Sequence, residues 1–127
     1  MDKTVSSKDL IKFGMRGYKD TVDVNWHGKI VEVKTLLSQE EEVRLIHDIV
    51  NFCTKEDGSS IMPELLDFST RLNIICAYAN INLPNNTDDI YKLVCYSDLY
   101  KYVIDNVNDV QVNNIIKSAT HIGLNGK

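Results

Sequence analysis

The sequence predicts an α+β fold in which an N-terminal β-hairpin precedes a body of four or five helices. Apolar residues alternate on both sides of a two-residue turn within residues 21–34, which predicts the hairpin. Apolar residues spaced three and four apart predict the helices within residues 39–122. We expect residues 1–20 to form an arm or a short helix and residues 123–127 a loose tail. A length of 127 residues suits one domain with its own core.

The composition excludes several classes of protein. Hydrophobic residues make up 43% of the chain, too many for a disordered protein. No apolar run is long enough to span a bilayer. The three cysteines (Cys53, Cys76 and Cys95) are far apart in sequence, without the close pairs of a metal site. We therefore expect them to be buried core residues, and we expect no metal or cofactor.

The hairpin is the clearest local signal in the sequence. A turn at His27-Gly28 suits a two-residue connection, because glycine adopts a positive φ without strain. The apolar residues then share one face, with Val22 opposite Val33, Val24 opposite Val31, and Trp26 opposite Lys29. We expect the Trp26 ring to pack over the next helix, near Ile46 or Val50.

Polar residues mark where the helices begin. Ser38 and Glu41 form a capping box before a helix whose apolar stripe holds Val43, Ile46, Ile49, Val50 and Cys53. We expect Gly58 to end that helix and Pro63 to open the next one. Asn86 or Thr87 caps a short helix, and Ser97-Asp98 begins another. Asn108 and Gln111 form an amide version of the capping box for the last helix, which we expect to end at Gly123.

No catalytic motif is present, so we do not expect an enzyme. The three histidines lie in different predicted elements, and a small enzyme would require His47 or His121 to meet carboxylates in one cleft.

The candidate interaction residues fall into two groups. The first is a run of basic residues that would form one stripe on a helix (Lys8, Lys12, Arg16 and Lys19). The second is a set of aromatic residues (Trp26, Tyr91, Tyr96 and Tyr100). Both groups also fit a plain surface role, as a solvated charged face and as aromatic rings at the rim of the core.

Three segments resemble small proteins encoded in the structural gene clusters of low-GC bacteriophages. They are residues 25–41 (NWHGKIVEVKTLLSQEE), residues 63–71 (PELLDFSTR) and residues 78–84 (YANINLP). The resemblance spans about residues 22–118, and the arm through Asp20 lies outside it. Some such proteins are tail assembly chaperones, which hold the tape-measure protein before the tail tube polymerises. The resemblance implies a non-enzymatic viral protein of the host cytoplasm or the virion.

We therefore expect a morphogenesis protein that binds another virion protein. The alternative is a phage-encoded inhibitor of a host defence protein or nuclease, which would use an acidic surface. The formal net charge of −4 argues against a general nucleic-acid binder, and no membrane partner is expected. We also expect self-association, through the hairpin edge or the tyrosine-rich C-terminal helices.

The capping box gives a first testable prediction. Ser38→Ala should lower the free energy of unfolding by about 1 kcal/mol, because the helix loses its N-cap acceptor. Ser38→Asp should be nearly neutral, since aspartate caps as well as serine does. Denaturant titration measures both, and equal losses would place the helix start elsewhere.

Overall fold

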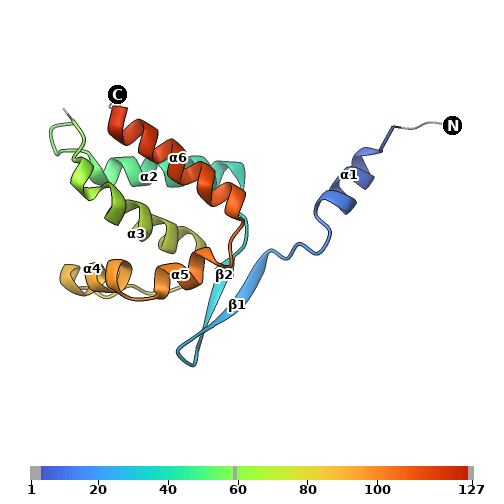
Figure 1. The fold of residues 1–127 in the computed structure, drawn as a ribbon, viewed down its shortest axis with the longest axis horizontal. Coiled ribbons are helices and arrows are strands. Elements are labelled where there is room, and N and C mark those ends of the chain that lie inside the picture. The colour runs from blue at the N-terminus through green and yellow to red at the C-terminus, as the bar shows by residue number, and fades with distance from the viewer. Residues whose placement is uncertain (1–3, 59, 126–127) are drawn as a thin grey trace.

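The computed structural model describes residues 4–58 and 60–125 and confirms the α+β fold. An N-terminal helix, α1 (Ser7–Gly14), precedes a hairpin of strands β1 (Thr21–Trp26) and β2 (Lys29–Lys34). The body comprises helices α2 (Gln39–Cys53), α3 (Leu66–Tyr78), α4 (Thr87–Tyr96), α5 (Leu99–Ile104) and α6 (Asp109–Asn125). A 3₁₀ turn, η1 (Pro63–Leu65), leads into α3. The hairpin reaches past α5, and α1 stands clear of the body (Figure 1).

The hairpin has the predicted register. Val22 pairs with Val33, Val24 with Val31, and Trp26 with Lys29. His27 and Gly28 adopt φ values of 52° and 83°, the two positive values of a type I′ turn. The Asn25 carboxamide steadies this turn by accepting a hydrogen bond from the Gly28 amide at 2.9 Å.

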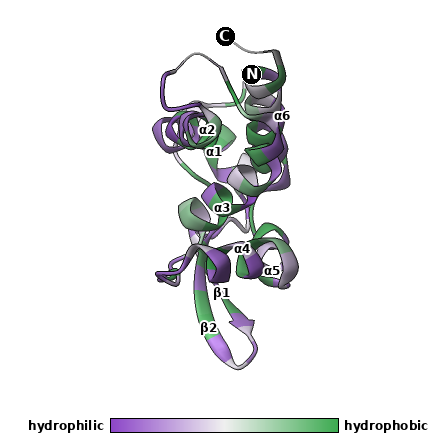
Figure 2. Ribbon diagram, turned by 90° about the vertical axis from the view of Figure 1, so that its left-hand side faces the viewer, coloured by the Kyte–Doolittle hydropathy of each residue, from purple (hydrophilic) through white to green (hydrophobic). Residues whose placement is uncertain are grey.

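The core lies where α2, α3 and α6 pack together and cover the base of the hairpin. Val33, Ile49, Ile74, Ile75 and Ile115 are fully buried there. Both hydrophobic and hydrophilic residues are visible along these helices (Figure 2), as expected for amphipathic elements that face water on one side.

The predicted capping box of α2 is present. The Glu41 amide donates to the Ser38 hydroxyl at 3.2 Å, and the Ser38 amide donates to the Glu41 carboxylate at 3.0 Å. Lys34 Nζ lies 2.8 Å from the same carboxylate. The bond from Lys34, with the bond from the Ser38 amide, lowers the pKa of Glu41 to about 2.

Two details of α2 differ from the prediction. The helix ends at Cys53, five residues before Gly58, because Thr54 turns to an extended conformation and its hydroxyl binds the Val50 carbonyl. Gly58 instead occupies a later turn, with φ at 71°. The buried stripe contains Leu45, whereas Val43 is 46% exposed.

The last helix and one cysteine also differ from expectation. Helix α6 continues through Gly123 to Asn125. A Cβ atom at Gly123 would lie only 3.2 Å from the Leu66 methyl groups, so this glycine permits close helix packing and does not end the helix. Residues 126–127 of the predicted loose tail lie outside the described residues.

Cys53 is buried as predicted and Cys95 is half-buried, but Cys76 is exposed.

Gln111 forms a buried polar hub, although the sequence predicts only a helix cap for it. Its Oε1 accepts from the Leu37 amide at 2.8 Å and from the Tyr78 hydroxyl at 2.7 Å. Its Nε2 donates to the Leu37 carbonyl at 2.9 Å and to Glu42 at 3.0 Å. The side chain thus uses both lone pairs and both N–H groups. The predicted cap is half correct, because Asn108 accepts from the Gln111 amide at 2.9 Å but the Gln111 side chain turns inward.

The two outer edges of the hairpin differ in whether another segment of the chain pairs with them. The outer edge of β2 is covered, because the Asn80 amide donates to the Glu32 carbonyl at 2.9 Å and Ala79 bridges to Val33. Within residues 4–58 and 60–125, no strand pairs with the outer edge of β1. Pairing through the hairpin edge therefore has only β1 available.

No helix in the described part of the chain combines the length and the apolar character that crossing a bilayer requires.

The hub predicts an ordered series of stability losses. Gln111→Ala should lower the free energy of unfolding by about 2–4 kcal/mol, because it leaves both backbone groups of Leu37 buried without their partner. Tyr78→Phe should cost only about 1 kcal/mol, because Gln111 then keeps its bonds to Leu37.

Asn114→Ala, on the exposed side of α6, is the control and should stay within about 0.5 kcal/mol of the wild type. Chemical denaturation gives all three values. A Gln111→Ala loss no larger than that of Tyr78→Phe would contradict the role given to the hub.

Candidate protein-binding surfaces

The first candidate surface is the N-terminal arm, which we define as residues 4–19. Ser6 caps α1 by accepting from the Asp9 amide at 3.1 Å. No residue of α1 is buried, and Leu10, Ile11 and Phe13 are 60%, 69% and 61% exposed. A helix of eight residues is not stable alone in water, so these exposed apolar side chains favour contact with another surface.

Thr35 binds the root of the arm to the rest of the chain. The Thr35 hydroxyl donates to the Lys19 carbonyl, and the Thr35 amide donates to the Asp20 carbonyl at 3.0 Å. Between the root and α1, the Tyr18 amide donates to the Met15 carbonyl at 3.0 Å and Gly17 adopts a φ of 79°. This short turn directs α1 away from the body (Figure 1).

The four basic candidates do not form one helical stripe. Lys8 and Lys12 are four residues apart on α1 and share a face. Arg16 and Lys19 lie beyond Gly14, where the helix ends, so the stripe predicted for all four is wrong. All four side chains are exposed, and the arm remains a basic segment.

The second candidate surface is a row of four aromatic rings that crosses three helices, which we call the aromatic row. Phe52 of α2 lies 5.7 Å from Phe68 of α3, which lies 5.6 Å from Tyr91 of α4. Tyr91 then lies 5.6 Å from Tyr96, and their hydroxyls are 3.4 Å apart. Each pair is edge-to-face, the geometry that aromatic rings prefer. Phe52, Tyr91 and Tyr96 are 44%, 43% and 76% exposed, so the row presents apolar surface to solvent.

Tyr100 is not part of this row. Its ring is half-buried and lies under the Arg71 guanidinium, 4.9 Å from the ring centroid. Burial raises the pKa of its hydroxyl. The structure therefore brings Tyr91 and Tyr96 together and places Tyr100 at the rim of the core.

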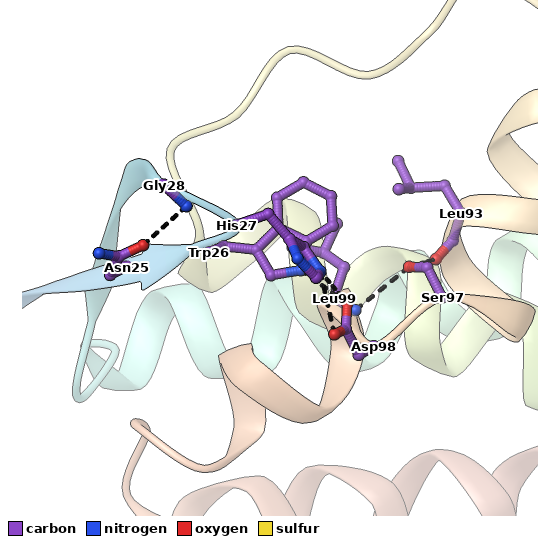
Figure 3. A network of polar contacts seen from close by, with 8 residues as sticks. All are labelled: Asn25, Trp26, His27, Gly28, Leu93, Ser97, Asp98 and Leu99. Atoms are coloured by element: carbon purple, nitrogen blue, oxygen red, sulfur yellow. Dashed lines mark hydrogen bonds and ion pairs between the residues drawn. The ribbon is translucent and has the colours of Figure 1, made fainter.

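Trp26 lies at the tip of the hairpin, not over α2. Its Nε1 donates to Asp98 Oδ1 at 2.7 Å, at the start of α5. His27 Nε2 lies 3.1 Å from both oxygens of the same carboxylate. Figure 3 shows the two rings converging on Asp98 from the hairpin. The prediction that Trp26 packs near Ile46 or Val50 is wrong, because its indole N–H donates to Asp98, the residue that precedes α5.

Asp98 joins the hairpin to the helical body at this point. The bonds from Trp26 and then His27 lower the pKa of its carboxyl. Nearby, the Leu99 amide donates to the Ser97 hydroxyl at 3.1 Å, which holds the start of α5. We call Trp26, His27 and Asp98 the tip anchor.

The described residues contain no group of histidine, cysteine and acidic side chains that could hold a metal ion. His47 is exposed on α2, and His121 lies on α6.

Comparison with known proteins identifies no relative. The chain matches no protein-family model, no curated protein and no solved structure.

Sequence reasoning missed several members of these surfaces. Phe52 was not recognised because it lies outside the predicted apolar stripe of its helix, and Phe68 because its spacing is that of a core residue. Asp98 was interpreted only as a helix start. Two features of the sequence could have indicated its role. One is its neighbour Ser97, and the other is the single tryptophan, whose indole N–H requires an acceptor when the ring is partly buried.

The tip anchor predicts a pH response of the hairpin. An aspartate with a lowered folded pKa stabilises the contact above its ordinary pKa, and this stabilisation is lost as the pH falls through the lowered value. Emission of Trp26, the sole tryptophan, should therefore shift to the red below about pH 4.

Asp98→Asn keeps an acceptor for the indole but does not titrate, so it should abolish this step. Asp105→Asn, also next to α5 and paired with Lys101 at 2.9 Å, is the matched control and should retain it. A step that survives in Asp98→Asn would assign the titration to another group.

Proposed function

We propose that this chain is a non-enzymatic protein that binds another virion protein during bacteriophage tail assembly, as tail assembly chaperones do. The observation that carries the proposal is the aromatic row. Exposed tyrosine and phenylalanine rings are enriched where proteins bind one another, and contiguous apolar surface on a protein favours burial against a partner. The resemblance of residues 25–41, 63–71 and 78–84 to phage structural-cluster proteins supports the choice of partner.

The geometry of the row suits an apolar segment of a client protein. Rings from α2, α3 and α4 contact one another in succession, so a bound segment would contact three helices at once. The two tyrosine hydroxyls at one end offer hydrogen bonds to the backbone of such a segment. Binding in the host cytoplasm would keep the client from aggregating before the tail tube forms.

The alternative, an inhibitor that imitates nucleic acid, has less support. Such an inhibitor requires a dense surface of unneutralised carboxylates. Four acidic side chains instead pair with lysine or arginine at 2.8–3.4 Å, namely Glu40, Glu41, Asp67 and Asp105. These pairs break up the negative surface of the body.

Capture of partners from infected cells tests the proposal. The tagged wild-type chain should retain the tape-measure protein or the tube protein, and the double variant Tyr91→Ala/Tyr96→Ala should retain roughly tenfold less, as expected when interface aromatics are truncated. Tyr102→Ala is the matched control, because Tyr102 is 38% exposed and lies outside the row.

Capture of a host nuclease in place of virion proteins would support the alternative function. Equal capture by the double variant and the wild type would exclude the aromatic row as the binding surface.

A further inference from the structure

We infer that the N-terminal arm docks on a second copy of this chain, in a groove between α2 and α3, so that two copies exchange arms. The groove has a volume of about 220 Å³ and is lined by Leu37, Glu41, Arg44, Leu45, Asp48, Asn73, Cys76 and Ala77. This is smaller than the roughly 300–1,000 Å³ of small-molecule sites, and it suits a few inserted side chains.

The two surfaces match in their apolar character. Leu10 and Phe13 are three residues apart and share one face of α1, whereas Ile11 lies on the side of Lys8. Leu37, Leu45 and Ala77 supply apolar surface in the groove. Burial of the arm's apolar side chains would provide the tertiary contact that so short a helix requires.

The two surfaces also match in charge. Residues 1–19 carry a net charge of +3, whereas the rest of the chain carries −7. The groove includes the exposed carboxylate of Asp48, whereas Glu41 is already paired with Lys34 and Arg44 adds one positive charge to the lining. Opposite charges on arm and body favour the encounter of two copies. The acidic body would be repelled by an anionic membrane, so the basic arm fits an acidic protein surface better.

A second copy fits better than docking within one copy. The arm is held at its root by Thr35, and only the short turn at residues 15–18 separates the root from α1, which stands clear of its own body. Each copy supplies one arm and one groove, so a two-fold axis would form both contacts at once and close the assembly as a dimer.

Sedimentation of the full chain over a range of concentrations tests the inference. The wild type should form dimers, which weaken as salt rises because charges contribute to the contact. Phe13→Asp on the arm and Asp48→Lys in the groove should each weaken dimerisation, Phe13→Asp by roughly 30-fold or more, as expected for the loss of a central anchor. Both positions are exposed, so the fold of the body should be unchanged. Tyr96→Ala, which alters the aromatic row, should dimerise like the wild type.

Mixing separates arm exchange from other dimers. Phe13→Asp keeps an intact groove, and Ala77→Arg, which fills the groove, keeps an intact arm. Each should be monomeric alone, but together they should form a heterodimer through one intact arm–groove contact. Asp48→Lys replaces Ala77→Arg in this mixture if the latter does not fold. Failure to associate on mixing would overturn the inference.

Cross-linking identifies the contact directly. Cys76 is exposed and lines the groove, so Leu10→Cys, on the face of α1 that would enter the groove, should form a disulfide-linked dimer under oxidising conditions at alkaline pH. Adding Cys76→Ser should abolish this dimer. A disulfide within one copy would show that the arm docks on its own body, and a strictly monomeric wild type would also contradict the inference. Neither result bears on the aromatic row, so the proposed function can be judged separately.

Discussion

The buried carboxamide of Gln111 is the interaction that joins the parts of this protein. It pairs with both backbone groups of Leu37, in the segment between the hairpin and α2, much as a neighbouring strand would. It also binds Tyr78 at the end of α3 and Glu42 on α2. Because Leu37 offers one donor and one acceptor, only one orientation of the amide satisfies both. The hub therefore sets the position of α6 relative to the hairpin, which packing of apolar side chains alone would not specify.

The polar interior is satisfied throughout the described residues, where no buried side-chain nitrogen or oxygen lacks a hydrogen-bond partner. Ser69 illustrates this, because its hydroxyl donates to the Ile49 carbonyl of α2 at 2.7 Å and also accepts from Asn73. A buried serine without such a partner would destabilise the contact between α2 and α3. The body is thus held by specific hydrogen bonds as well as by apolar packing.

Local rules predicted the elements well and their long-range contacts poorly. The register of the hairpin and the Ser38 capping box followed from residues fewer than fifteen positions apart, where turn and cap chemistry decide the outcome. The hub joins residues 74 positions apart, and the local capping rule assigned the Gln111 side chain a different partner. Gly123 was misread for a similar reason, because its value lies in the space it leaves for Leu66. The aromatic row could not be foreseen either, since its rings come from three helices whose packing the pattern does not specify.

The hairpin is attached very differently at its two ends. At its base, Val33 is fully buried, and Asn80, Asn108 and Gln111 all bind the chain near it. At its tip, the Asp98 carboxylate accepts from the half-buried Trp26 indole and contacts His27, and the side chains of His27 and Asp98 are 65% and 41% exposed. Local opening of a protein follows the weakest contacts, so the strands should fray from the turn inward. The molecule thus combines a buried base with a more exposed tip, and the rate at which strand amide hydrogens exchange with solvent should fall from Trp26 toward Val22.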